Sequence, residues 1–250
     1  MAVFDMLLLG AAAFFAGVLN TIAGGGTFLT FPALVYTGVP VVAANATSAV
    51  AVFPGYLGGA LGFKREIAAF ERKRLVRIAL ATMVGGTIGS LLLLVSSNKA
   101  FSVVVPFLLV IATLAFAFGD TLQAWARRSR FAKPEGLVGT LVVSIYGGYF
   151  NGGLGIVLLA LFALWGMRDL NAMNALKNGQ SFILSAISVA IFAAGGIVAW
   201  PQAVLMMVAA TLGGYAGAPL ARALPPAVVR GTVIAVGVVT SAIFFARLFG

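Results

Sequence analysis

The chain has 250 residues, of which 62% are hydrophobic and 9% charged, and its formal net charge is +10. Soluble domains carry about 45–50% apolar and about 25% charged residues, so the composition excludes a soluble domain and predicts an integral membrane protein. Histidine and cysteine are absent, and Asp and Glu together number six, so we expect no metal, no cofactor and no enzymatic activity.

The N-terminal segment, "MAVFDMLLLG", has neither the basic region nor the cleavage site of a signal peptide, so we expect it to remain in the mature chain. The first break in the apolar pattern is "GVLNTIAGGGTFLTFPALVYTG", residues 17–38. The apolar stretch that follows spans about 12 residues, or roughly 18 Å as a helix, which is short of a hydrocarbon core of about 30 Å. The pattern predicts a helical hairpin that turns within the membrane, or a break between two short spans.

The backbone of this break is suited to a ligand. The consecutive glycines Gly24, Gly25 and Gly26 allow positive φ angles and a close approach. Their N–H groups, and that of Thr27 at the start of the next helix, would direct partial positive charge at a bound group. The pattern therefore favours an anion. Asn20 either belongs to the same site or only caps the broken backbone.

Basic residues gather in two segments, "FKREIAAFERKRLVR" and "AWARRSRFAKPEG". Between them lie Ile78–Val95 and Phe101–Phe118, which are joined by "SSNKAF" and are each long enough to cross a bilayer. Because cytoplasmic loops concentrate Lys and Arg, we expect residues 64–77 and 127–133 to face the cytoplasm of a cell-membrane protein. This placement explains the net charge without nucleic acid as a partner.

Five further segments follow the second basic loop, with breaks near Asn151, Arg168, Ile197 and Pro225. Two of them, Ser181–Ala199 and Val228–Phe245, have the length of a membrane span. Three motifs of the second half resemble motifs of the first half and occur in the same order. "GYFNGGLG" corresponds to "GVLNTIAGGG", "AMNALK" to "AANATS", and "GGYAGAPLA" to "GGTIGSLLL". We infer a duplication, with a first repeat at 1–119, a basic linker at 120–136 and a second repeat at 137–250.

The charges also indicate how the repeats are oriented. The helix that begins near Asn45 ends at a basic loop, whereas its counterpart near Asn174 ends at the uncharged "GGIVAWP". The sequence therefore predicts an all-α, polytopic membrane protein of two inverted repeats. We expect about five helical segments in each, roughly 8–10 in total, with broken or re-entrant helices at the Asn/Gly motifs.

In the second half, "NALKNGQS" places Asn174, Lys177, Asn178 and Ser181 on one face of a helix. Such a polar stripe is expected to face the interior of the bundle or an aqueous path. Alternatively, Lys177 extends to the lipid headgroups. The matching "ANATS" residues of the first half either bind a ligand or only form hydrogen bonds between helices.

The "GGxxG" motifs at Gly85 and Gly213 follow the small-residue spacing of close helix contacts, so we expect them to serve packing. The acidic residues all lie near the ends of apolar segments or in loops, which also favours an anionic substrate over a cation. The candidate substrate-binding residues are Asn20, Gly24, Gly25, Gly26, Thr27, Asn45, Thr47, Ser48, Asn151, Gly152, Asn174, Lys177, Asn178 and Ser181.

The stretch "GVLNTIAGGGTFLTFPALVYTGVPVVAANATSAVAVFPGYLGG" resembles the N-terminal signature of the sulfite exporter TauE/SafE family, also called the toluene sulfonate uptake permeases. The resemblance extends over nearly the whole chain, although the second half lacks a counterpart of Pro32. It implies transport of sulfite, sulfoacetate or related organosulfonates. It carries over to Asn20, Gly24–Gly26, Pro32, Asn45 and Thr47, with Asn151 and Asn174 as counterparts in the second half.

We therefore predict a secondary transporter that exports a small sulfur-containing anion by alternating access around a site near the membrane midplane. A small-anion channel, or a carrier of a non-sulfur organic anion, remains an alternative. An enzyme or a structural subunit is a third class, which the duplication and the residue composition disfavour. The expected partners are the anionic substrate, the lipid bilayer and, as an open question, further copies of the chain.

Overall fold

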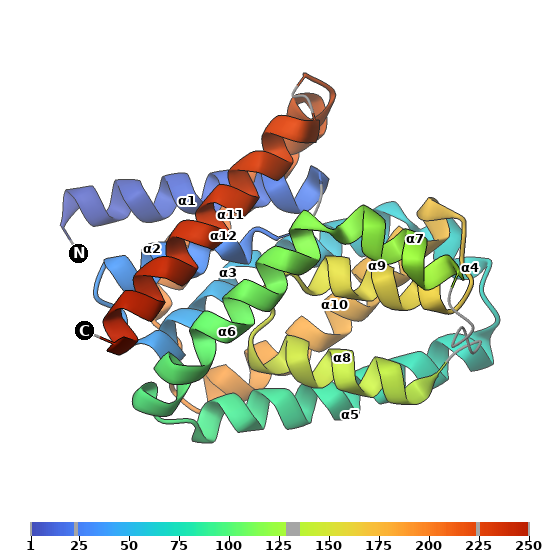
Figure 1. The fold of residues 1–250 in the computed structure, drawn as a ribbon, viewed down its shortest axis with the longest axis horizontal. Helices are drawn as coiled ribbons and strands as arrows, with labels where there is room; N and C mark the ends of the chain where they lie inside the picture. Colours follow the sequence, from blue (N-terminus) through green and yellow to red (C-terminus); the bar gives the residue numbers. More distant parts are fainter. Residues whose placement is uncertain (1, 23–24, 129–135, 224–225, 250) are drawn as a thin grey trace.

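The computed structural model describes residues 2–22, 25–128, 136–223 and 226–249, and every regular element in these ranges is a helix. The first half contains α1 (Val3–Ile22), α2 (Thr27–Tyr36), α3 (Val41–Gly62), α4 (Lys64–Ala68), α5 (Arg72–Val95) and α6 (Asn98–Ala117). The second half contains α7 (Gly119–Arg128), α8 (Leu137–Tyr149), α9 (Leu154–Leu164), α10 (Leu170–Ala194), α11 (Trp200–Ala223) and α12 (Pro226–Phe249). The prediction of an all-helical protein is confirmed (Figure 1).

Four helices of the described part are long and apolar enough to cross a membrane, and these stretches are Val3–Asn20, Arg72–Val95, Asn98–Ala115 and Asn171–Ala194. The predicted span Ser181–Ala199 was placed too late, because α10 ends at Ala194. Gly196, with a φ of 69°, turns the chain there. The short helices α4 and α7 lie in or beside the basic segments and add to the segments that the sequence predicts.

Two helical hairpins interrupt the pattern of spanning helices. They are α1–α2 and α8–α9, and their turns fall at the Asn/Gly motifs. The helix α2 has 10 residues and α9 has 11, which is about 15–17 Å and short of a hydrocarbon core of about 30 Å. Both hairpins therefore turn back within the thickness of the protein.

The hairpins open toward opposite ends of the molecule. The first opens where α2 leads into Gly38. The second opens at the basic end, where the guanidinium of Arg74 lies 3.8 Å from the sulfur of Met167. In Figure 1, α4 and α7 lie at the right-hand end, whereas α1 begins and α12 ends at the left.

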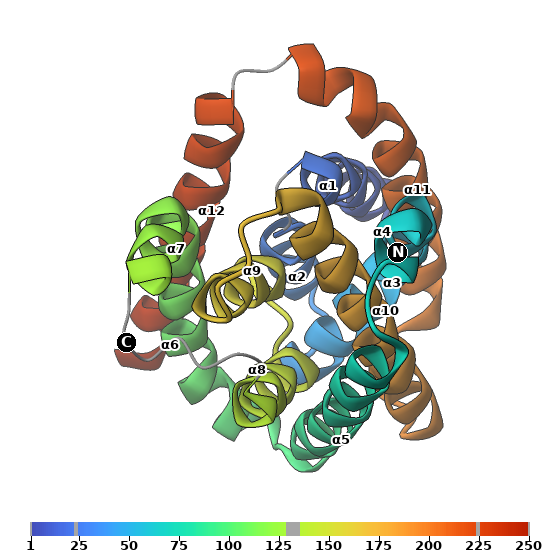
Figure 2. The same ribbon diagram turned by 90° about the vertical axis from the view of Figure 1, so that its right-hand side faces the viewer.

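Most contacts between the two halves have a counterpart in which the roles of the first and second half are reversed. The helix α1 packs along α11 as α5 packs along α8, and α3 contacts α11 as α10 contacts α5. The pairs α3–α10 and α6–α12 join helices that the predicted duplication makes counterparts (Figure 2). Phe53 and Phe182 each stand eight residues after the Asn of their motif, and their rings stack at 5.5 Å between centroids. Equivalent rings therefore meet between the halves.

Glycines make the closest of these helix contacts possible. A Cβ added at Gly85 would lie 2.6 Å from the carbonyl oxygen of Leu141, and one at Gly89 would overlap that of Ile145. In the equivalent pair, a Cβ at Gly17 would overlap the carbonyl of Ala210, and one at Gly213 that of Phe14. The expectation that the "GGxxG" motifs serve packing is confirmed at these positions.

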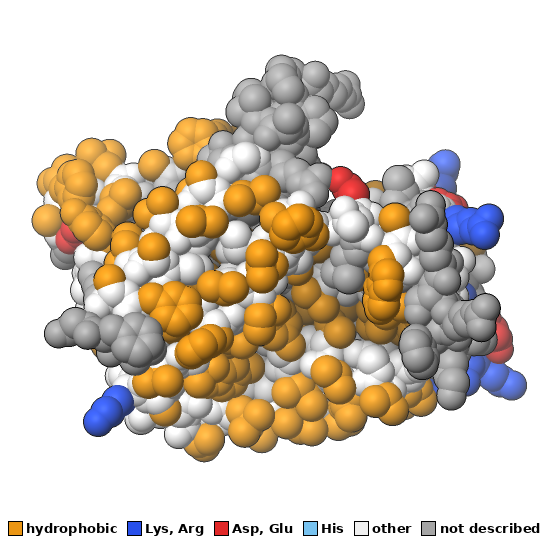
Figure 3. Space-filling model, viewed as in Figure 1, with side chains coloured by type: hydrophobic (Ala, Val, Ile, Leu, Met, Phe, Trp, Pro, Cys, Tyr) orange, Lys and Arg blue, Asp and Glu red, His pale blue; other side chains and the backbone are white. Residues whose placement is uncertain are grey.

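The charged and apolar surfaces are separated along the molecule. Hydrophobic side chains cover most of the length seen in Figure 3, and Lys and Arg gather at the end that carries α4. The exposed basic residues there include Lys64, Arg65, Arg72 and Lys73. Exposed apolar side chains such as Leu80, Leu91 and Phe107 lie on the helices between the two ends. This arrangement fits a multi-pass membrane protein, whose apolar belt faces lipid.

Replacing Gly17 with alanine should lower the melting temperature of the protein in detergent, because the new Cβ forces α1 away from the backbone of α11. We expect a loss of about 1–3 kcal/mol. The matched control is Gly10→Ala on the same helix, where no atom lies within 4 Å of the added Cβ and the higher helix propensity of alanine should leave stability equal or raised. Equal melting temperatures for both variants would contradict the close α1–α11 contact.

Candidate functional site

The first hairpin tip is held by an asparagine side chain. The N–H of Gly26 donates a hydrogen bond of 2.8 Å to Oδ1 of Asn20. Gly25 has a φ of 95°, which favours glycine, and the N–H of Phe28 donates to the carbonyl of Gly25 at 3.0 Å. Thr27 is buried at the start of α2. In this conformation the N–H of Gly26 is thus occupied by Asn20, and Gly24 lies outside the described residues.

The second tip is built from "FNGG". Asn151 has a φ of 61°, and Gly153, with a φ of 68°, stands immediately before α9. The hydroxyl of Tyr146 donates a hydrogen bond to the carbonyl of Gly152. Asn151 is 5% exposed, and its Oδ1 is a buried acceptor with no partner among the described residues. The predicted counterparts Asn20 and Asn151 therefore both lie at a tip, but only Asn20 has its Oδ1 engaged there.

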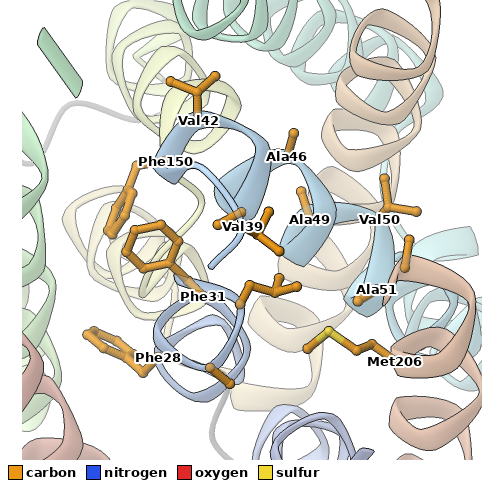
Figure 4. Packing of buried hydrophobic residues seen from close by; sticks show 14 of the residues in the cluster. Phe28, Phe31, Val39, Val42, Ala46, Ala49, Val50, Ala51, Phe150 and Met206 are labelled. Atoms are coloured by element: carbon orange, nitrogen blue, oxygen red, sulfur yellow. The ribbon is translucent and has the colours of Figure 1, made fainter. Parts of the chain in front are cut away.

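The two hairpins contact each other through aromatic rings. Phe150, next to the second tip, meets Phe31 in the middle of α2 edge to face at 5.9 Å, and Figure 4 shows the two rings side by side. Asn45 of α3 lies close to these rings, because its Nδ2 donates a hydrogen bond of 2.8 Å to the carbonyl of Tyr149, the residue before Phe150. This bond caps the end of α8. The Oδ1 of Asn45 is buried and has no partner in the part of the chain that the structure describes.

The neighbours of Asn45 point to different helices. The hydroxyls of Ser48 and Thr30 are hydrogen-bonded at 2.6 Å, which joins α3 to α2. The hydroxyl oxygen of Thr47 instead accepts a bond of 2.9 Å from the N–H of Ala199, just before α11. The structure thus brings Ser48 toward the first hairpin and directs Thr47 away from it.

On α10 the predicted polar stripe lies close to the second hairpin. The Cδ of Lys177 lies 3.3 Å from the position that a Cβ would take on Gly155, in the first turn of α9. Asn174 and Asn178 are half-buried. Ser181 is 1% exposed, and its hydroxyl has no hydrogen-bond partner in the described ranges. The stem of a lysine side chain therefore packs against the first turn of α9, where the helix carries partial positive charge.

A cavity of about 720 Å³ lies at the end opposite the basic segments. It is lined by the connections between α2 and α3, between α5 and α6, and between α10 and α11, including Pro40, Ser97, Asn98, Ile197 and Gln202. The Oδ1 of Asn98 accepts a bond of 3.1 Å from the N–H of Val42. Residues from both halves thus form a mouth at this end, with polar and apolar side chains in its lining.

Sequence reasoning missed further buried polar side chains. They lie on α5, α8 and α10, they have no hydrogen-bond partner within the described residues, and they are Thr82, Thr140, Ser144, Gln180 and Ser185. The spacing of Thr140 and Ser144, four residues apart on one helix face, was a signal for the pair on α8. Gln180 stands within "NALKNGQS" but off its predicted stripe.

A family model described as "Sulfite exporter TauE/SafE" matches residues 9–244 of the chain. A "Probable membrane transporter protein" of Haemophilus influenzae is 29% identical over 233 residues, which is 92% of this chain and 91% of the relative. The "Probable membrane transporter protein YfcA" of Escherichia coli K12 is 29% identical over 248 residues, which is 94% of this chain and 89% of the relative. The "Probable membrane transporter protein ORF9" of a Sinorhizobium species is 27% identical over 236 residues, which is 93% of this chain and 89% of the relative. No solved structure gives a significant match.

The bond from Asn45 to Tyr149 predicts a structural cost for its loss. Asn45→Ala should destabilise the protein by about 1–3 kcal/mol, because the partly buried carbonyl at the end of α8 would lose its donor. Asn171→Ala, at an exposed position of α10, is the control and should stay within about 0.5 kcal/mol of the wild type. Thermal unfolding in detergent measures both. If the two variants melt together, Asn45 does not hold the tip.

Proposed function

Because the chain belongs to the sulfite exporter TauE/SafE family, we propose that this membrane transporter carries a small sulfur-containing anion, such as sulfite, sulfoacetate or a related organosulfonate, out of the cell. The site would lie at the second hairpin tip, between α3, α9 and α10. Asn45, Asn151, Asn174, Lys177 and Ser181 are the side chains that we assign to it. Asn20, Gly25, Gly26, Thr27 and Ser48 would form the equivalent part of the first hairpin, with Thr47, Gly152 and Asn178 at the edge of the site.

The position of Lys177 carries this proposal. Its aliphatic stem runs over the first turn of α9, at Gly155, where the helix dipole places partial positive charge. The lysine side chain and this end of the helix both carry positive charge, so both attract an anion. The acidic side chains of the described part are exposed or half-buried and lie near helix ends. The one placed near α9 is Asp120, an exposed residue next to Gly119, which packs against Ile156. The local field therefore favours a negatively charged ligand.

The asparagines add a second requirement. The Oδ1 atoms of Asn45 and Asn151 are buried acceptors with no partner among the described residues. An acceptor needs a donor, which a fully ionised oxyanion lacks. Sulfite in its singly protonated form supplies both a negative charge for Lys177 and one hydrogen for an asparagine oxygen. Where sulfite is the substrate, we therefore propose that this form is the one bound, so that any coupled proton crosses with it.

The paired contacts support a mechanism of alternating access by inverted repeats. Under this proposal, residues 1–119 and 137–250 are the repeats, 120–136 is the linker, and the two hairpins enter from opposite faces of the cell membrane. The basic end would face the cytoplasm, and the cavity of about 720 Å³ would be the outer mouth. Export of a monovalent anion is then favoured by the inside-negative potential, by about 2.3 kcal/mol per 100 mV.

Lys177→Met should lower the rate of sulfite efflux from loaded proteoliposomes at least tenfold, because the substrate would lose its counter-charge beside α9. A tenfold change corresponds to about 1.4 kcal/mol. The control is Lys99→Met, at an exposed position of the opposite end, which should transport within twofold of the wild type.

Equal rates for the two variants would contradict the assigned site. Sulfoacetate, sulfate and acetate in the same assay test the substrate class, and transport of acetate alone would contradict a sulfur-containing anion. Conductance steps in a planar bilayer, in place of slow turnover, would identify a channel instead of a carrier.

A further inference from the structure

The helices α5, α8 and α10 run side by side in the same direction, and their contacts place their residues in register. The hydroxyls of Ser90 and Ser188 are hydrogen-bonded at 2.8 Å. One turn earlier, a Cβ on Gly86 would lie 3.4 Å from Leu184, and one on Gly85 would lie 2.7 Å from the Cβ of Ser144. Figure 2 shows the three helices together. On each of the three helices, the residue one turn closer to the basic end than these contacts should therefore lie at the same depth in the protein.

Polar side chains occur at successive helical turns along this interface of α5, α8 and α10. Thr82 lies one turn before Gly86, Thr140 one turn before Ser144, and Gln180 one turn before Leu184. We define the polar seam as Thr82, Thr140, Ser144, Gln180, Ser181 and Ser185. Each of the six is at most 3% exposed and carries a side-chain oxygen or nitrogen without a hydrogen-bond partner in the described ranges.

Other hydroxyls of the described helices are bonded to a carbonyl one turn earlier, although that of Thr113 on α6 also lacks a partner among the described residues. Ser241 donates to the carbonyl of Gly237 at 2.7 Å, and Thr211 to that of Met207 at the same distance. Serine and threonine in membrane helices commonly satisfy themselves in this way. Thr82, Thr140 and Ser144 do not, although leaving a buried polar group unpaired costs free energy. Their oxygens are therefore available to a ligand or to water.

The other half of the protein shows that packing does not require them. Gly148 and Gly17 are the first residues of the two Asn/Gly motifs. Four residues before Gly148 stands Ser144, whereas four residues before Gly17 stands Ala13. Three residues before Gly85 stands Thr82, and three before Gly213 stands Ala210. Counting from the repeated motifs in the same way, the counterparts in the first half are Leu9 for Thr140, Ala51 for Gln180, Val52 for Ser181 and Tyr56 for Ser185. The equivalent interface of α1, α3 and α11 is close-packed and apolar at all these positions except Tyr56.

We propose that the polar seam is the aqueous access route between the basic end and the hairpin site, and that the transported anion passes along it. This rests on the proposed function. Hydroxyl and amide groups suit such a route, because neutral donors replace part of the hydration shell of an anion without holding it as a fixed charge would. A cavity of about 280 Å³ adjoins the seam at its basic end; Gln180 is the polar side chain of its lining, and the other lining residues, such as Ile78 and Leu176, are apolar or glycine.

The absence of cysteine from the chain allows a direct test by single substitutions. Ser144→Cys should react with a charged, water-soluble thiol reagent applied from the basic-loop side of membrane vesicles. Ala13→Cys, its buried counterpart on α1, is the matched control. We expect Ser144→Cys to react at least tenfold faster, and an excess of sulfoacetate to slow that reaction. Equal, slow labelling of the two cysteines would overturn the route.

A second measurement separates this role from a structural one. Thr82→Val keeps the shape of the side chain and removes a hydroxyl that has no partner in the described part of the chain. We expect an unchanged or higher melting temperature together with at least fivefold slower sulfite efflux. A lower melting temperature with efflux within twofold of the wild type would overturn the proposal. If the wild type transports no anion while Ser144→Cys still reacts rapidly, the proposed function fails and the access route remains.

Discussion

A broken helix inside a membrane must have its free backbone groups satisfied by the protein, because lipid offers no hydrogen bonds. The rest of this structure follows from that constraint. At the first tip Asn20 accepts from the N–H of Gly26, and at the second tip Tyr146 donates to the carbonyl of Gly152. Asn45, from the other half of the chain, caps α8 at Tyr149. The second hairpin is therefore held in part by a helix of the first half, whereas the first tip is held by an asparagine of its own half.

Glycine determines how closely the halves can approach. The α5–α8 and α1–α11 contacts use the same device, in which a missing Cβ lets one helix lie against the backbone of the next. Since lipid is as apolar as the side chains, such close packing replaces the hydrophobic effect that would hold a soluble core. The stacked rings of Phe53 and Phe182 lie where equivalent helices cross. Packing is thus nearly the same in the two halves, and their chemical differences lie in the polar residues between the helices.

Much of this arrangement could be predicted from the sequence because it depends on local pattern. The Asn/Gly breaks and the short segment after Thr27 allowed either a hairpin within the membrane or a break between two short spans, and both place an interruption at these motifs. The spacing of the glycines predicted close helix contacts. The end of α10 was predicted less well, since "GGIVAW" is apolar enough to continue a span and only the backbone at Gly196 shows the turn. The polar seam was missed for a different reason. Serine and threonine are common in membrane helices, and only the packed structure shows which of them lack a partner.

The same distinction bears on the site residues. The helix face that holds Lys177 and Ser181 could be predicted from a spacing of four residues, but the partner of that face could not. Thr47 and Ser48 are adjacent in sequence and serve different helices, because successive residues of a helix point about 100° apart. A motif therefore identifies the helix that carries a site, whereas the neighbouring helices decide which of its residues belong to it.

Under the proposed mechanism of alternating access, the difference between the halves has a consequence for transport. Two identical inverted repeats would make the inward-open and outward-open states equal in free energy. Here an apolar interface must expose apolar surface to water when it opens, which is unfavourable. The polar seam, opening to water, instead gains hydrogen bonds for groups that have no partner among the described residues while it is closed. The basic end should therefore open at a lower cost than the equivalent interface of α1, α3 and α11, so that the resting transporter favours loading from that end. For an exporter whose basic end faces the cytoplasm, that is the end at which the substrate enters.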